Sequence, residues 1–159
     1  MIIELAHFAL VLAFLLSLLQ SVVPLAGAAH GRHGWMVLGR QTAWSSLGLC
    51  TISLLGLAHA YALSDFSVMN VVQNSHTLKP LLYKLSGTWG NHEGSMLLWV
   101  WMLSLWSALV ATRGKHLPPT LQARTLAFQG MIMAGFSLFV LAASSPFARL
   151  DPAPVEGLG

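Results

Sequence analysis

The segment Tyr83–Trp106, YKLSGTWGNHEGSMLLWVWMLSLW, joins two kinds of sequence, and we call it the junction. Its first half is polar, rich in glycine, and carries Lys84, His92 and Glu93. Its second half consists mainly of Met, Leu, Val and Trp and has no charge. The junction therefore predicts a polar loop that leads directly into a membrane-spanning helix.

The composition of the whole chain agrees with this prediction. Of the 159 residues, 55% are hydrophobic and only 8% are charged, and the mean hydropathy is +0.68. Soluble domains carry about 25% charged residues, so the composition indicates an integral membrane protein. The net charge of +3 comes from few charges and forms no basic patch, so no nucleic-acid partner is expected. The single Cys50 is expected to be a small buried side chain.

Four apolar runs predict an all-α, polytopic integral membrane protein. About 20 apolar residues span a bilayer as a helix. We expect one membrane region with spans at about 2–25, 42–63, 95–111 and 126–143. Pro24 is expected to end the first span, and Gly48 and Gly56 are expected to let the second pack closely against its neighbours. A long outer loop at 64–94 separates the second and third helices, and a tail follows at 144–159.

The distribution of basic residues predicts the orientation. The loops at 26–41 and 112–125 hold five of the eight Lys and Arg residues and none of the five acids. The positive-inside rule therefore places these loops in the cytoplasm. The N-terminus, the loop at 64–94 and the tail are then on the outer side, which in a bacterium is the periplasm.

The start of the third span could receive an anionic group. A helix that enters the membrane from outside presents free N–H groups and a positive dipole end to the outer water. Ser95 is the expected N-cap, and such an end suits a carboxylate or a propionate. Glu93 opposes such a site unless it pairs with Lys84 or His92.

The tryptophans of the junction allow two interpretations. Trp99 and Trp106 are seven residues apart and share a helix face, whereas Trp101 points elsewhere. Their indoles could form a flat apolar shelf for a ligand, or they could be the aromatic belt common at membrane interfaces. His92 could ligate a metal or haem iron, or form a charge pair.

Other polar residues give weaker signals. Glu4 and His7 lie one turn apart near the start of the first span. They are either an interfacial pair or a functional intramembrane pair. His30 and His33 lack third and fourth ligands, so no metal site is expected there. The chain has no nucleophile elbow, phosphate-binding loop or dinucleotide fingerprint, so the catalytic residues are unknown.

Several strings of the sequence resemble one family. They are ELAHFAL at 4–10, DFSV at 65–68, NS at 74–75, YKLSGTWGNHEGSMLLW at 83–99 and SSPFARL at 144–150. Together they are similar to the N-terminal part of the CcmF family, which is related to the NrfE group and to haem-handling proteins of the CcsA type. The resemblance covers essentially the whole chain, and the WGNHEGS string is its most specific part.

The resemblance implies a role in cytochrome c maturation. CcmF-like proteins act when haem from the chaperone CcmE is joined to the CxxCH motif of apocytochrome c. The chain is then expected to be a component of a haem lyase in the bacterial inner membrane, active at its periplasmic face. The implied partners are the remainder of CcmF, CcmH, CcmE, CcmI, apocytochrome c and membrane lipid, and the implied cofactor of the full-length family is haem b.

The resemblance also selects candidate site residues. The candidates for haem or chaperone docking are Trp89, Gly90, Asn91, His92, Glu93, Gly94, Ser95 and Trp99, with Lys84 as the partner of a haem propionate. The family's second, WGxxWxWD-like signature is absent, and family members are several times longer. We therefore expect an N-terminal portion of a larger protein that is not an enzyme alone, and no axial-ligand role is carried over to its histidines.

Two other functions are compatible with the sequence. One is a standalone haem- or quinone-binding helical bundle, with His7, His59 and His92 as ligands. The other is a small transporter that uses Glu4 and His7, although the sequence shows no inverted repeat.

Overall fold

The computed structural model describes residues 1–159 and contains helices without a β-sheet. The long helices are α1 (Ile2–His30), α2 (His33–Leu63), α5 (His92–Arg113) and α6 (Pro119–Ala143). The short ones are α3 (Met69–Asn74), α4 (Leu81–Gly87) and the 3-10 helix η1 (Gly114–His116). The predicted all-α membrane fold is confirmed, because these long helices supply four candidate membrane spans.

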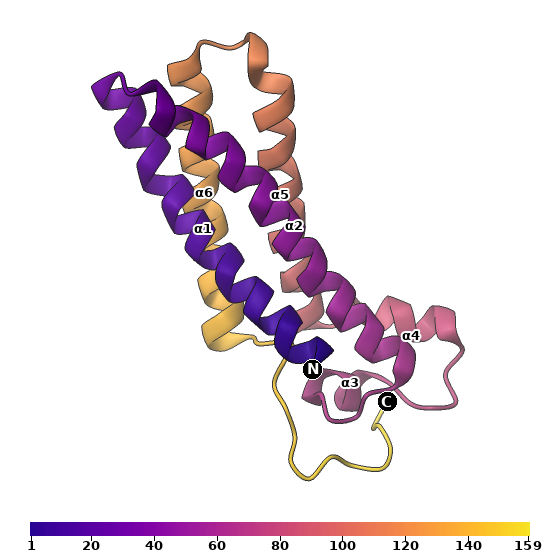
Figure 1. Cartoon of the computed structure of the whole chain (residues 1–159). Coiled ribbons are helices and arrows are strands. Elements are labelled where there is room, and N and C mark those ends of the chain that lie inside the picture. The colour runs from indigo at the N-terminus through magenta and orange to yellow at the C-terminus, as the bar shows by residue number, and fades with distance from the viewer.

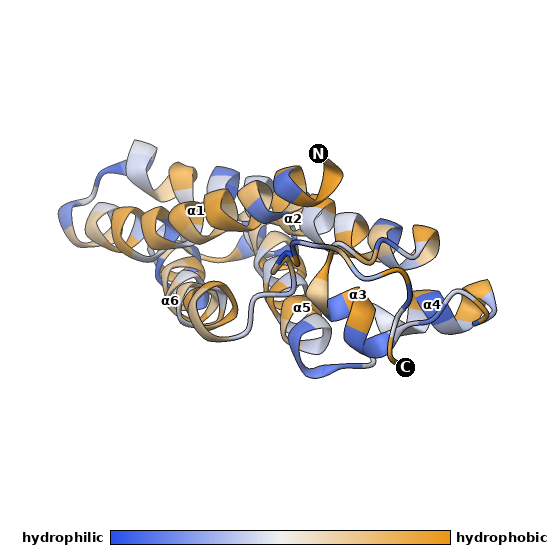
Figure 2. Cartoon of the chain, turned by 90° about the horizontal axis from the view of Figure 1, so that it is seen from below, coloured by the Kyte–Doolittle hydropathy of each residue, from blue (hydrophilic) through white to orange (hydrophobic).

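The long helices form an up-and-down bundle (Figure 1). α1 packs against α2 and α6, and α5 packs against the same two helices. Seen from below, α1 and α2 form one layer and α5 and α6 the other (Figure 2). One end of the bundle carries residues 64–91 and the tail 144–159, which we call the cap. The opposite end, which we call the turn end, holds the two short connections α1–α2 and α5–α6.

Small residues let the helices approach closely. A Cβ atom on Gly39 would lie 2.6 Å from Cγ of Pro24, and one on Gly56 would overlap Ala6. Gly130 brings α6 against α1 in the same way, because its Cβ would lie 2.8 Å from the backbone nitrogen of Ser21. The predicted packing role is thus confirmed for Gly56 and wrong for Gly48, which faces open space.

The bundle has an apolar core and apolar outer faces. Leu10, Leu57, Leu97 and Met133 are fully buried, and so is Cys50, as predicted. Large apolar side chains such as Phe8, Trp44, Leu55 and Phe128 are exposed on the outside of the helices. A helix that is apolar all round is typical of a membrane span.

The helices extend beyond the expected spans. The expected loop at 26–41 is wrong, because only Gly31 and Arg32 separate α1 from α2. Gly31 takes a left-handed conformation with φ of 67°, which glycine adopts without strain. α1 also continues through Pro24, and the side-chain-free Gly39 leaves room for the proline ring. The expected loop at 112–125 shrinks to η1 and the two residues after it.

The cap is held together by backbone hydrogen bonds between its two segments. The amide of Met69 donates to the Ala148 carbonyl at 2.8 Å, and the amide of Leu158 donates to the Val72 carbonyl at 2.7 Å. The hydroxyl and amide of Thr77 donate to the Glu156 carboxylate and lower the pKa of Glu156 to about 2. The tail therefore packs on residues 64–91, which contain α3 and α4. The expected loop at 64–94 thus ends three residues too late, because α5 begins at His92.

Candidate functional site

Asn91 begins helix α5. Its side-chain oxygen accepts a hydrogen bond from the Gly94 amide at 2.8 Å, which is N-cap geometry. The prediction that Ser95 caps this helix is wrong, because Ser95 lies inside α5 and its hydroxyl donates to the His92 carbonyl at 2.9 Å. The N-cap of α5 thus lies four residues earlier than expected, next to the cap.

Four polar side chains join the cap to the bundle, and we call them the Asn91 network: Tyr61, Asn70, Asn91 and Glu93. The Tyr61 hydroxyl donates to Oδ1 of Asn70 at 2.6 Å. Nδ2 of Asn70 lies 2.9 Å from Oδ1 of Asn91 and 3.2 Å from Oε2 of Glu93. The carboxylate of Glu93 is therefore occupied by α3 and pairs with neither Lys84 nor His92.

The glycines of the WGNHEGS string and its surroundings allow close packing. A Cβ atom on Gly94 would fall on the carbonyl oxygen of Thr88, and one on Gly90 would lie 3.0 Å from the Ser86 carbonyl oxygen. Gly87 lies against the ring of Tyr61, where a Cβ atom would come within 2.6 Å. Close contacts with neighbouring atoms therefore explain why glycine stands at these positions.

One face of α5 remains exposed and carries His92, Trp99 and Trp106 at intervals of seven residues. Nδ1 of His92 lies 3.0 Å from the Ser144 hydroxyl at the end of α6. The ring of His92 meets Phe139 edge-on, with a centroid distance of 6.4 Å. No hydrogen bond of the structure involves Nε2 of His92, so this nitrogen is available to a ligand.

An apolar pocket lies beside His92, between α5 and α6. It is a shallow, open hollow of about 410 Å³, lined by Met96, Met131, Ile132, Gly135, Phe136 and Phe139. Met96 follows His92 by one turn of α5, and Phe139 contacts the His92 ring. The structure therefore places an imidazole at the edge of an apolar surface formed mainly by α6.

The tryptophans do not form a stacked shelf. The side chains of Trp89 and Trp99 are 51% and 53% exposed, and the aromatic pairs of the structure involve neither. Trp101 points elsewhere, as predicted, and its indole nitrogen donates to the Thr51 hydroxyl at 2.9 Å. Trp89 lies in the turn before α5, whereas Trp99 lies two turns inside it.

Lys84 lies on α4 and is partly buried. Its ammonium group donates to the Ser64 hydroxyl at 2.7 Å, just after the end of α2. It shares no contact with His92 or Glu93 among the hydrogen bonds and ion pairs of the structure. A haem propionate could pair with Lys84 only if this bond to Ser64 were broken.

The remaining ionisable candidates are Glu4, His7 and His59, and none of them lines the pocket beside His92. Glu4 forms ion pairs with the N-terminal amine and with Arg149 of the tail. His7 packs edge-on against Phe147 at 5.9 Å, and its Nδ1 is buried without a hydrogen-bond partner. His59 is exposed beside Leu63. His7, His59 and His92 share no pocket and form no metal-ligand cluster.

Sequence reasoning missed several residues around the junction. Tyr61 and Asn70 complete the Asn91 network, and Phe139 and Ser144 contact His92. Ser144 belongs to the SSPFARL string, so its proximity to WGNHEGS had a signal in the sequence. Phe139 had none, because an aromatic residue in an apolar span is ordinary.

The fold and the cap together define a multi-pass helical membrane protein with its polar chemistry at one end. A family model described as cytochrome C assembly protein matches residues 89–156, which include the WGNHEGS string and the whole of α5 and α6.

Individual relatives cover nearly the whole chain. It is 50% identical over 157 residues to the cytochrome c-type biogenesis protein ccl1 of Rhodobacter capsulatus, covering 99% of this chain and 24% of the relative. It is 44% identical over 158 residues to the cytochrome c-type biogenesis protein CcmF of Haemophilus influenzae, again with 99% and 24% coverage. The solved structure of a cytochrome c heme lyase CcmF superimposes with a TM-score of 0.87 at 27% identity, covering 92% of this chain and 25% of that one.

The chain is thus similar over nearly its whole length to CcmF-type cytochrome c biogenesis proteins, and it spans about a quarter of the length of the relatives it matches.

Proposed function

We propose that this chain forms one part of a CcmF-type cytochrome c haem lyase. The observation that carries the proposal is the superposition on the cytochrome c heme lyase CcmF, which extends over 92% of this chain. The chain corresponds to 25% of that structure, so the proposed activity belongs to the assembled lyase and not to this bundle alone.

Within that lyase, the exposed face of α5 and the adjoining turn form the docking surface. The surface consists of Trp89, Gly90, Asn91, His92, Glu93, Gly94, Ser95 and Trp99. His92 and Trp99 are exposed on α5, and Trp89 is exposed in the turn. Asn91, Glu93 and Gly94 support this surface from beneath through the cap contacts described above.

The residues present fit a haem in part. Haem b is flat and apolar, and the pocket beside His92 offers apolar walls from Met96, Phe136 and Phe139 with a free imidazole nitrogen at its edge. The propionates need a cation, and Lys84 is the candidate once its bond to Ser64 is exchanged. These residues hold and orient the cargo at the membrane edge, and the remaining contacts come from the rest of the lyase.

The partners proposed for this surface follow from the same role. They are the haem chaperone CcmE, the remainder of CcmF, CcmH, CcmI and apocytochrome c. The cap then faces the periplasm and the turn end faces the cytoplasm of a bacterial inner membrane, in agreement with the excess of Lys and Arg at the turn end.

A complementation experiment tests the proposal. In cells that depend on this gene for c-type cytochromes, Trp89→Ala or His92→Ala should lower haem-stained cytochrome c about two- to tenfold, because an aromatic contact contributes about 0.5–1.5 kcal/mol. Trp44→Ala is the matched control, because Trp44 is 52% exposed on α2 and Trp89 is 51% exposed.

Two outcomes would contradict the proposal. An equal loss for all three variants at equal protein levels would indicate general damage to the bundle. Normal cytochrome c maturation in cells without the chain, together with no co-purification of CcmE or CcmH, would remove the proposed function altogether.

A further inference from the structure

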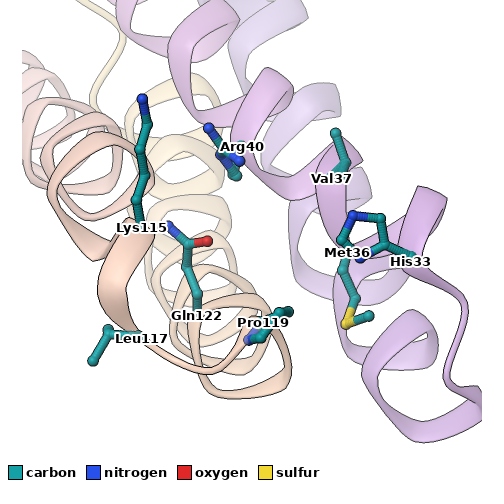
Figure 3. A pocket seen from close by; sticks show the side chains of 8 residues that line it. All are labelled: His33, Met36, Val37, Arg40, Lys115, Leu117, Pro119 and Gln122. Atoms are coloured by element: carbon teal, nitrogen blue, oxygen red, sulfur yellow. The ribbon is translucent and has the colours of Figure 1, made fainter.

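The turn end of the bundle contains a polar pocket, at the opposite end from the docking surface. It encloses about 260 Å³ between α2 and the start of α6 (Figure 3). Its lining residues are His33, Met36, Val37, Arg40, Lys115, Leu117, Pro119 and Gln122. Figure 3 shows Arg40 and His33 on the wall formed by α2, with Lys115 and Gln122 on the facing wall.

The cations of this pocket have no partner within the chain. Arg40 is partly buried, yet neither Arg40 nor Lys115 forms an ion pair, and all ion pairs of the structure involve residues of the cap end. All five acids lie at the cap end. The 22 residues of α5 separate the ends by about 33 Å, far beyond a Debye length of about 8–10 Å. The carboxylates of the chain therefore do not neutralise this pocket.

The helix ends at the pocket add to its positive potential. α2 begins at His33 and α6 begins at Pro119, so two helix N-termini lie at the pocket wall. Two of the opposing carbonyl groups near the end of α5 are already occupied. Nε2 of Gln122 donates to the carbonyl oxygens of Val110 and Ala111, at 3.0 and 3.2 Å.

The pocket lies at the ends of the candidate membrane spans, where the headgroup layer of a bilayer is expected. Arg32 stacks over Trp35 at 4.6 Å in the first turn of α2, and Trp with Arg is typical of the membrane interface. Met36, Val37 and Leu117 supply apolar wall beside the cations. A ligand for this pocket therefore carries negative charge next to an apolar body.

We propose that the pocket of His33, Arg40 and Lys115 binds the headgroup phosphate of an anionic phospholipid in the leaflet at the turn end. Arg40 and Lys115 contact the phosphate from facing walls, and the apolar wall accommodates the start of the acyl chains. Basic pockets between membrane helices are suited to such headgroups. The site is independent of the proposed function, because it shares no residue with the docking surface.

The test is lipid binding to the full chain in an uncharged detergent, measured by native mass spectrometry. Short-chain phosphatidylglycerol should bind more tightly than short-chain phosphatidylcholine. The double variant Arg40→Gln/Lys115→Gln should weaken phosphatidylglycerol binding by about 25-fold, because each cation near an anionic lipid contributes about fivefold. Phosphatidylcholine binding should not change.

Two controls test the position of the site and the identity of its ligand. Arg124→Gln is compared with the single variant Arg40→Gln, because each removes one positive charge from the same end of the bundle, but Arg124 is exposed and does not line the pocket. An equal loss in Arg124→Gln would overturn the proposal, because only the bulk charge would then matter. Inorganic phosphate is the second probe, and its binding with displacement of the lipid at equal concentration would also overturn the lipid assignment. Circular dichroism confirms that each variant is folded.

Discussion

Asn91 connects three parts of the molecule through one side chain. Its Oδ1 atom caps α5, while its Nδ2 atom lies 3.0 Å from the Tyr61 hydroxyl on α2 and 2.6 Å from the Gly87 carbonyl at the end of α4. The docking surface therefore depends on a residue that a ligand need not touch.

Replacement of Asn91 should destabilise the protein. Asn91→Ala loses an N-cap bond, which contributes about 0.5–2 kcal/mol. It also loses the bonds from Nδ2 to the Tyr61 hydroxyl and the Gly87 carbonyl, at about 0.5–1.5 kcal/mol each. The thermal unfolding midpoint in detergent should fall clearly. Ser95→Ala is the control and should have little effect, because Ser95 is not the cap. Equal shifts for both variants would contradict the assignment of the cap.

Gly94 should not tolerate a methyl group. In an ordinary helix Gly→Ala stabilises by about 1 kcal/mol, but here the new Cβ atom would collide with the Thr88 carbonyl oxygen. Gly94→Ala should therefore lower the unfolding midpoint, whereas Gly48→Ala, in open space on α2, should maintain or raise it. A stabilising effect at both positions would show that Thr88 does not lie against α5.

The sequence located this region but not its contacts. The change from polar to apolar residues placed the start of α5 within three residues, because that change depends on local composition. The choice of Asn91 over Ser95 as cap depends on partners 21 and 30 residues away, Asn70 and Tyr61. Such partners follow from tertiary packing, which no local pattern contains.

At the scale of helices, α1 is held between α2 and α6 by residues without large side chains. Gly39 and Gly56 face α1 from α2, and Gly130 faces it from α6. In lipid, helices associate through such close van der Waals contacts. The hydrophobic effect does not drive their association there, because the lipid tails are as apolar as the helix surfaces.

Gly130→Ala tests the contact between α1 and α6. The Cβ atom would lie 2.8 Å from the Ser21 nitrogen and 3.0 Å from the carbonyl carbon of Gln20, both in rigid backbone. The helices must separate, so the free energy of unfolding should fall by about 1–3 kcal/mol, as is typical of overpacking, and the unfolding midpoint should fall with it. Gly135→Ala on the same helix meets no atom within 4 Å and serves as the control. A neutral result at Gly130 would contradict this helix pairing.

Helix number and order followed from hydropathy, whereas helix ends did not. The glycine-rich sequence of residues 26–41 suggested a loop, but it contains no proline, and of its four glycines only Gly31 takes a left-handed conformation, where the chain turns. Hydropathy reports the part of a helix in lipid and not its full length. The 29 residues of α1 span about 44 Å, more than the hydrocarbon layer of about 30 Å.

Charge is separated along the axis of the molecule, with all five acidic residues at the cap end and five of the eight Lys and Arg residues at the turn end. Cysteine labelling in whole cells tests the orientation proposed from this distribution. Leu82→Cys, at a 77% exposed position on α4, should react with a membrane-impermeant maleimide. His30→Cys, exposed at the turn end, should react only after permeabilisation. The native Cys50 is buried and gives a low background. The reverse pattern would invert the topology.

The separation of charges has a consequence for insertion into an energised membrane. Each elementary charge carried across 100 mV changes the energy by about 2.3 kcal/mol. The inside of the cell is negative. In the proposed orientation the cations of the turn end lie on that negative side and the carboxylates of the cap end lie on the positive side, so both lower the electrical energy and their contributions add. A molecule inserted upside down would have both sets on the unfavourable side. The membrane voltage itself then favours the proposed orientation over the inverted one while the chain is being inserted.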